Sequence, residues 1–255
     1  MRITLNHLLV LNTQSFGDIL LSTHIARLAE KYIPDYKVHF FIREGLTLTT
    51  DEHSAEAFQD VLKILRMQHN ITSVGIIKPE GIIETDAIIT GKTVPILIQG
   101  WSSDLGLIKS QLKPFYDEFN ITDDIDTETK FNVGSRKELT TDLVVGLAGT
   151  VDFLRKWHNP EEYEKFLAHL SSKRYDIRIE KFGVDVEKSS YSNQLKRLNN
   201  CDLLISPMGS LIHFAVGLNI DTISLTSVFP AEYDCPSYYH SGWHKEVKAE
   251  QPFHC

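Results

Sequence analysis

The chain has no excess of basic residues, because its 255 residues include 26 Lys and Arg against 34 Asp and Glu. The net charge of −8 at pH 7 argues against a nucleic acid or an anionic membrane held by the whole protein surface. A local basic patch remains compatible with this balance. The composition therefore excludes the function classes that need a globally positive protein.

Cysteines and long apolar runs are also scarce. The three cysteines, Cys201, Cys235 and Cys255, show no metal-ligand spacing, and their odd number suits a reducing compartment. The first residues lack the basic and apolar regions of a signal peptide. No apolar run approaches the roughly 20 residues of a membrane span. We therefore expect a cytoplasmic protein without stable membrane insertion.

What the chain does have is an alternation of short apolar runs with segments of helical periodicity. In the first half we expect strands at 7–12, 37–42, 73–77, 87–90 and 95–98, helices at 19–32 and 46–68, and a loop followed by a helix within 101–119. In the second half we expect strands at 142–147, 175–179, 202–206 and 220–225, and helices at 160–171, 191–198 and 211–218. After residue 225 the sequence predicts irregular structure. Such alternation indicates an α/β fold with doubly wound parallel sheets.

An acidic segment interrupts this alternation. Residues 121–130 are rich in Asp and Glu and poor in large apolar side chains, which predicts a linker ending near Glu138. The alternative is a surface loop within one domain. With a linker, the chain forms two Rossmann-like domains, 1–138 and 139–255, whose ligands bind at the carboxyl ends of the strands.

A break between a strand and a helix at residues 206–210 is the first candidate site. Gly209 and Ser210 stand where the helix begins, and free backbone N–H groups with the helix dipole make such a point suitable for a phosphate-sized anion. The alternative is a plain turn. His213, in an otherwise apolar helix, either contacts the same anion or is a core histidine with an internal partner.

Two further segments that follow predicted strands carry chemistry. In the first, Gly17 allows a close approach of the backbone, and Asp18 in the first helical turn can accept a proton from a hydroxyl. The alternative is a simple helix N-terminal charge. In the second, Thr150, Arg155 and Lys156 offer a hydroxyl and cations to a diphosphate. Here the alternative is a solvated basic loop.

Three motifs in sequence order resemble those of glycosyltransferase family 9, the heptosyltransferases that use ADP-heptose to build the lipopolysaccharide core. They lie at 17–34, at 156–163 and at 202–225. The resemblance implies a GT-B-like fold, in which two Rossmann-like domains face a cleft. It further implies that the N-terminal domain is the acceptor side and that the C-terminal domain binds the nucleotide sugar.

The same resemblance implies roles for individual residues. Asp18 is the general base, and the cations and the helix start stabilise the leaving diphosphate, so that no metal and no further cofactor is expected. The acceptor-side loop includes Ser15 and Gly17, and the diphosphate site comprises Thr150, Arg155, Lys156, Gly209, Ser210 and His213. The expected function is an inverting, metal-independent glycosyltransferase that moves a sugar from a nucleotide-diphosphate donor to an acceptor hydroxyl.

Two alternatives to this function remain open. The leading hypothesis leaves the acceptor unassigned among a glycan, a modified nucleic acid and a protein, whereas in the second the acceptor is a modified DNA base or a protein. In the third hypothesis the chain is a non-catalytic subunit that binds a nucleotide sugar, because Met208 stands where the family usually has an acidic residue. A basic groove on the N-terminal domain would favour DNA as the acceptor.

Overall fold

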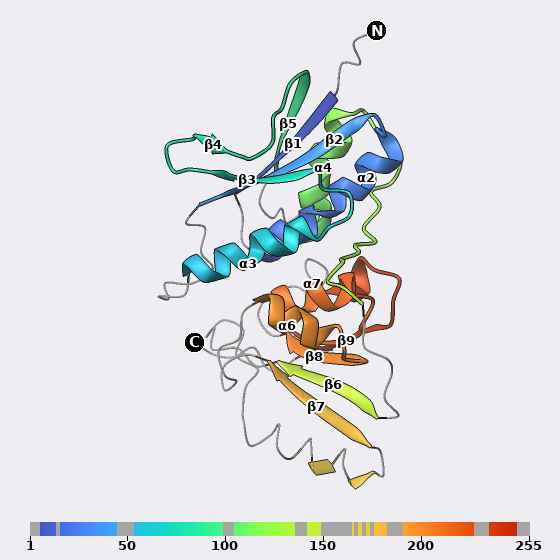
Figure 1. Ribbon diagram of the computed structural model, residues 1–255. Coiled ribbons are helices and arrows are strands. Elements are labelled where there is room, and N and C mark those ends of the chain that lie inside the picture. Colours follow the sequence, from blue (N-terminus) through green and yellow to red (C-terminus); the bar gives the residue numbers. More distant parts are fainter. Residues whose placement is uncertain are drawn as a thin grey trace, which may run out of the picture. The chain divides into compact units, whose positions relative to one another are not determined.

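The chain divides into two compact units in the computed structural model, residues 1–132 and residues 133–255 (Figure 1). The sequence placed this boundary at 138, and the acceptor and donor roles of the two domains remain predictions. The structure describes residues 6–13, 16–44, 54–98, 105–135, 142–148, 165, 168–169, 172–173, 176–182, 191–226 and 235–248.

The first unit is built on a five-stranded sheet with the order β4-β3-β2-β1-β5. All neighbouring strands are parallel except β3 and β4. The strands are β1 (Asn6–Asn12), β2 (Tyr36–Arg43), β3 (Ser73–Ile77), β4 (Ile83–Glu84) and β5 (Lys92–Ile98). The helices are α1 (Phe16–Ser22), α2 (His24–Tyr32), α3 (Ser54–Arg66) and α4 (Leu107–Glu118). The central strand β2 is buried without interruption over residues 38–42, as is typical of a central strand in a parallel sheet.

Two local predictions for this unit are wrong. The single helix expected at 19–32 is divided at Thr23, whose backbone N–H and hydroxyl both donate to the carbonyl of Leu20, at 3.1 and 2.6 Å. This tight turn replaces the regular helical bond at that point. The strand expected at 87–90 is absent, because the N–H of Ala87 bonds the hydroxyl of Thr85 in a local turn and Ile88 is 89% exposed.

The second unit has a five-stranded sheet with the order β10-β9-β8-β6-β7, in which all neighbours are parallel. Side chains from three of its central strands form a core cluster of Val145, Leu147, Ile205 and Leu225. The strands are β6 (Leu143–Ala148), β7 (Ile177–Phe182), β8 (Leu203–Pro207), β9 (Asp221–Thr226) and β10 (His244–Lys248). The helices described in full are α6 (Tyr191–Leu198), α7 (Ser210–Gly217) and the short 3₁₀ helix η2 (Pro236–Tyr238).

The prediction of irregular structure after residue 225 is wrong, because β10 adds a parallel edge strand to β9. The N–H of Thr222 donates to the carbonyl of Trp243 at 3.1 Å, and the Thr222 hydroxyl lies 2.8 Å from Nδ1 of His244. These contacts fix the start of β10 against β9. Its sequence is largely polar, as is common for an edge strand.

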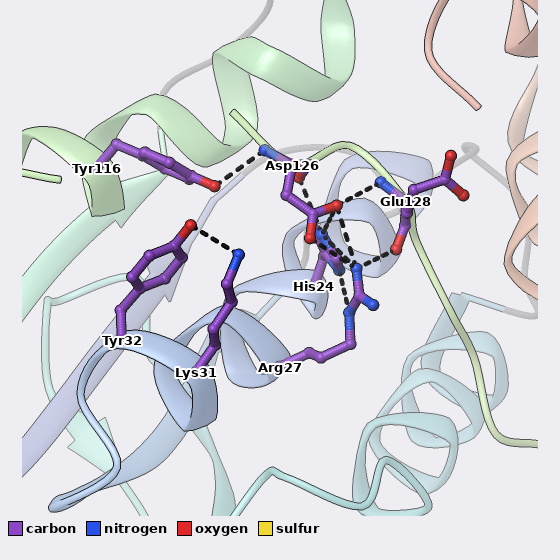
Figure 2. A network of polar contacts seen from close by, with 7 residues as sticks. All are labelled: His24, Arg27, Lys31, Tyr32, Tyr116, Asp126 and Glu128. Carbon is purple, nitrogen blue, oxygen red and sulfur yellow. Dashed lines mark hydrogen bonds and ion pairs between the residues drawn. The ribbon is translucent and has the colours of Figure 1, made fainter. Parts of the chain in front are cut away.

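The acidic segment predicted as a linker packs on the first unit over most of its length. Nη2 of Arg27 lies 3.3 Å from both carboxylate oxygens of Asp126 and 2.5 Å from the carbonyl oxygen of Glu128 (Figure 2). The ring of His24 bonds the Asp126 carbonyl at 3.0 Å, and the N–H of Asp126 donates to the hydroxyl of Tyr116 at 2.9 Å. This part of the chain is therefore an ordered surface segment of the first unit, which was the alternative to a linker.

A buried amide marks the end of the first unit. The N–H of Asn132 donates to Oε1 of Gln68 at 2.9 Å, and Nε2 of Gln68 donates to the carbonyl of Asn132 at 3.0 Å. Two residues later Gly134 has a φ of +96°, a left-handed conformation that favours glycine. The carbonyl of Gly134 accepts a bond from Asn199 of the second unit at 3.3 Å. The connection between the units is thus short and lies at 133–134.

Electrostatic interactions favour the contacts that hold the acidic segment on the first unit. Burial and the nearby Arg27 lower the pKa of His24 to about 4, so its ring is neutral at pH 7. Burial raises the pKa of Asp126, but the N–H of Glu128 and the positive charges of Arg27 and Lys31 outweigh it, and the net pKa is lowered. The Asp126 carboxylate therefore stays ionised at neutral pH and pairs with the guanidinium of Arg27.

We predict that Arg27→Ala loosens the acidic segment without unfolding the unit. Charge-assisted hydrogen bonds at a partly exposed site contribute about 1–2 kcal/mol, so amide exchange at Asp126 and Glu128 accelerates by about tenfold or more. Hydrogen exchange followed by mass spectrometry measures this change. The control is Lys113→Ala, which removes an exposed ion pair to Asp117 on α4 and leaves the exchange of the segment unchanged.

Two histidines form a buried chain of hydrogen bonds across the first sheet. Nε2 of His7 lies 3.1 Å from the carbonyl of Thr90, Nδ1 of His7 lies 2.8 Å from Nε2 of His39, and Nδ1 of His39 lies 2.7 Å from the Ser73 hydroxyl. The carbonyl can only accept, so with both rings neutral each ring donates through Nε2 and accepts through Nδ1. Burial, His7 and Lys37 lower the pKa of His39 to about 4.

We predict that the first unit loses stability as the pH falls below 6.5. The unfolded chain binds a proton at His39 with a pKa near 6.5, whereas the folded chain does so only near 4. The contribution of His39 to the stability is therefore complete above pH 6.5 and declines as the pH falls towards 4, by about 2 kcal/mol between pH 7 and 5. Urea unfolding followed by circular dichroism at these two pH values measures the decline.

The variant His39→Gln separates the contribution of His39 to this loss of stability from the contributions of other titrating groups. Its amide can still donate towards His7 but cannot ionise, so the decline between pH 7 and 5 becomes smaller by about 2 kcal/mol. His24, whose pKa is also about 4, still contributes its own part. In the control, His69→Gln at an exposed position, the decline matches that of the wild type. An unchanged decline in His39→Gln would contradict the assignment.

Candidate functional site

The first candidate site lies where the strand order of the first unit reverses. From β1 the chain proceeds through β2 and β3 on one side and later returns to β5 on the other side. Ligands of such sheets bind at the carboxyl ends of the strands beside this switch point. Strand β1 ends at Asn12, and α1 begins at Phe16, so Gly17 and Asp18 stand in the first helical turn at that edge. Both residues are partly exposed.

Buried amide side chains hold Asp18 in place. Nδ2 of Asn12 donates to the backbone carbonyl of Asp18 at 3.3 Å and to the hydroxyl of Ser22 at 2.8 Å. Nε2 of Gln111, from α4, donates to Oδ1 of the Asp18 carboxylate at 3.2 Å. The arrangement places a fixed carboxylate at the switch point, where it can accept a proton. Ser15, the other residue predicted for this loop, lies outside the described residues.

The second candidate site lies beside the switch point of the sheet in the second unit. Strand β6 lies between β7 and β8, so its carboxyl end is the switch point of this sheet. Strand β8 ends at Pro207, and Gly209 precedes Ser210, the first residue of α7. The N–H groups at this helix start, together with the helix dipole, can bind an anion. Gly209 and Ser210 are partly exposed, as anion binding requires.

The backbone at Gly209 is extended. Its φ of 162° and ψ of −174° describe an extended conformation that any residue adopts, so the glycine is not needed for a positive φ. The absence of a side chain still lets a ligand approach the backbone closely. Thr150, Arg155 and Lys156 lie outside the described residues, but their segment follows directly from β6, which ends at Ala148.

His213 is buried in α7. One of the two interpretations of the sequence, a core histidine with an internal partner, expected this burial. It is 3% exposed, and its Nδ1 lies 2.7 Å from the hydroxyl of Tyr239. The rings are tilted against each other with centroids 6.0 Å apart. Contact between His213 and a bound anion remains a prediction. No pattern in the sequence pointed to Tyr239, because it comes 26 residues later, after η2.

The described residues show neither a cluster suited to a metal ion nor a helix suited to a membrane. Among these residues, no group of three or more His, Cys, Asp or Glu side chains is placed to hold a metal ion. Within the same part of the chain, no helix combines the length and the apolar character needed to cross a membrane. The two described cysteines, Cys201 and Cys235, are buried free thiols.

Neither a protein-family model nor a curated protein sequence matches the chain. Several solved structures do. E. coli heptosyltransferase WaaC with ADP has a TM-score of 0.59 at 11% identity, over 95% of this chain and 93% of that chain. A family 9 glycosyltransferase from Veillonella parvula has a TM-score of 0.60 at 14% identity, over 98% of this chain and 87% of that chain.

A third match is the iron-containing dodecameric glycosyltransferase TibC from enterotoxigenic E. coli. Its TM-score is 0.56 at 12% identity, over 98% of this chain but only 63% of that chain. At such identities the likeness concerns the fold. The fold class expected from the sequence, two Rossmann-like α/β domains as in GT-B-like glycosyltransferases, is confirmed, and so is the resemblance to family 9 at the level of the fold.

Proposed function

We propose that the protein is an inverting, metal-independent glycosyltransferase that moves a sugar from a nucleotide-diphosphate donor to an acceptor hydroxyl. One observation carries the proposal: in both units the predicted motif stands at the switch point of the sheet. Asp18 follows β1 in the first unit, and Gly209 with Ser210 follows β8 in the second. The fold shared with heptosyltransferases supports the same activity.

The second unit binds the donor. Strands β6 and β8 are parallel neighbours, with Leu147 opposite Ile205, so the segments that follow them start from one edge of the sheet. The diphosphate accepts hydrogen bonds from the N–H groups at Ser210 and from Thr150, and it pairs with Lys156 and Arg155. These groups stabilise the negative charge that develops on the diphosphate as it leaves.

The first unit presents the acceptor, flanked by Ser15 and Gly17. Asp18 takes the proton from the acceptor hydroxyl while the hydroxyl oxygen attacks the anomeric carbon of the donor sugar. The bond from that carbon to the phosphate oxygen breaks, and its electron pair remains on the nucleoside diphosphate. Attack from the face opposite the leaving group inverts the anomeric centre.

Cationic side chains and the N-terminus of a helix supply the positive charge that a metal ion supplies in other transferases. Lys156 and Arg155 supply positive charge, and the amino end of α7 adds its partial charge. A matched structure, TibC, contains iron. The donor experiments below are therefore carried out in the presence of a chelator, so that they test metal independence directly.

We predict that Asp18→Asn and Asp18→Ala lower the rate of sugar transfer about 10²–10⁴-fold, because neither side chain accepts the acceptor proton. The measurement is a single-turnover assay with a panel of nucleotide sugars that includes ADP-heptose. Asp117→Asn, an exposed carboxylate on α4, is the matched control and keeps the wild-type rate. Wild-type rates in both Asp18 variants would remove the proposed base.

We predict that Lys156→Ala weakens the binding of ADP about tenfold or more, because one ammonium that pairs with the diphosphate is lost. Calorimetry with ADP and EDTA measures the dissociation constant. Lys173→Ala, an exposed lysine of the same unit, binds ADP as the wild type does. Binding that disappears on adding EDTA would contradict metal independence. Intact binding without transfer to any acceptor would favour the non-catalytic alternative.

A further inference from the structure

Gln111 is a fully buried polar residue of the first unit. It lies on α4, is 0% exposed, and donates from Nε2 to Oδ1 of Asp18 at 3.2 Å. Its Oε1 is buried and has no hydrogen-bond partner among the described residues. A buried amide oxygen without a partner is destabilising, whereas a leucine of similar size would not carry this penalty. The retained amide therefore calls for an explanation beyond packing.

The orientation of the amide follows from the chemistry of its neighbour. A reversed amide would place Oε1 about 3.2 Å from a carboxylate oxygen, so two acceptors would face each other. With Nε2 towards Asp18, the amide donates to the charged form of the carboxyl group. Such a bond favours ionisation and fixes the side-chain rotamer.

The support behind Gln111 is rigid. Helix α4 packs against α1, and the neighbours Leu112 and Phe115 are both 0% exposed. On the other side Asn12, also 0% exposed, holds the backbone carbonyl of Asp18. The backbone and the side chain of Asp18 are thus each held by a different buried amide, from β1 and from α4.

We propose that Gln111 is a positioning residue that holds the Asp18 carboxylate ionised and oriented for proton transfer. The inference rests on the proposed role of Asp18 as the base. Gln111 itself contacts neither substrate nor reacting atoms in this proposal. It acts through the hydrogen bond to Oδ1.

The test compares Gln111→Leu and Gln111→Glu with the wild type. In both variants the carboxyl of Asp18 titrates at higher pH in a ¹³C NMR titration, because a donor is lost or replaced by a second carboxyl. In Gln111→Leu the ionisation equilibrium of Asp18 shifts by about tenfold. The Asp18 signal is assigned by its absence in Asp18→Asn, and no substrate is needed.

Transfer kinetics give the second readout. The rate of Gln111→Leu falls about tenfold on the acid limb of the pH profile and recovers as the pH rises, since more Asp18 ionises there. The melting temperature stays within a few degrees of the wild type, because leucine also removes the unpartnered Oε1. The control is Tyr116→Phe, which removes a hydrogen bond of α4 to Asp126 and moves neither the titration nor the pH profile.

An unchanged titration of Asp18 in Gln111→Leu, with the rate lowered equally at every pH, would overturn the proposal and leave Gln111 a structural role. If Gln111→Leu does not fold, Gln111→Met removes the donor with little change of side-chain length and answers the same question. A different result would contradict the proposed function of Asp18 as the base. Wild-type transfer by Asp18→Asn removes the base, whatever the titration shows.

Discussion

Parallel pairing of the strands is the constraint on which the rest of the structure depends. In each sheet the central strands are parallel, so their carboxyl ends meet at one edge, and the order β4-β3-β2-β1-β5 or β10-β9-β8-β6-β7 creates one switch point there. Asp18 follows β1, and Gly209 with Ser210 follows β8, so both candidate sites result from strand order. With a different strand order, the same motifs would be ordinary turns between a strand and a helix. Each motif taken alone in the sequence is also compatible with such a turn.

The sequence predicted elements whose local chemistry is unambiguous. Strand β3 at Ser73–Ile77 and helix α6 at Tyr191–Leu198 have the expected bounds. Elements that depend on distant partners escaped prediction. The residues of β10 alternate weakly, and the strand forms because Thr222 on β9 bonds Trp243 and His244. Thr23 splits a helix through a turn that a periodic pattern does not reveal.

The residues of the candidate sites show the same difference between local signals and contacts with distant partners. Asp18, Gly209 and Ser210 were found because a carboxylate or a glycine after a strand has a recognisable chemistry within a few residues. Gln111 escaped because its partner Asp18 is 93 residues away in the chain. The apolar periodicity of residues 107–118 predicts a buried helix face, but it does not tell which element a polar residue on that face contacts. Tyr239 beside His213 escaped for the same reason.

Two glutamines of the first unit show how a structural amide differs from the one beside Asp18. Gln68 is 8% exposed and uses both ends of its amide, since Oε1 accepts from the N–H of Asn132 and Nε2 donates to the Asn132 carbonyl. Gln111 is 0% exposed, and among the described residues its amide has a partner for its donor alone, the Asp18 carboxylate. An amide that served only to hold two segments of the chain together would gain stability by satisfying both ends, as Gln68 does. The Oε1 of Gln111, which has no partner among the described residues, is the energetic cost of a donor aimed at Asp18, and this fits the positioning role proposed for Gln111.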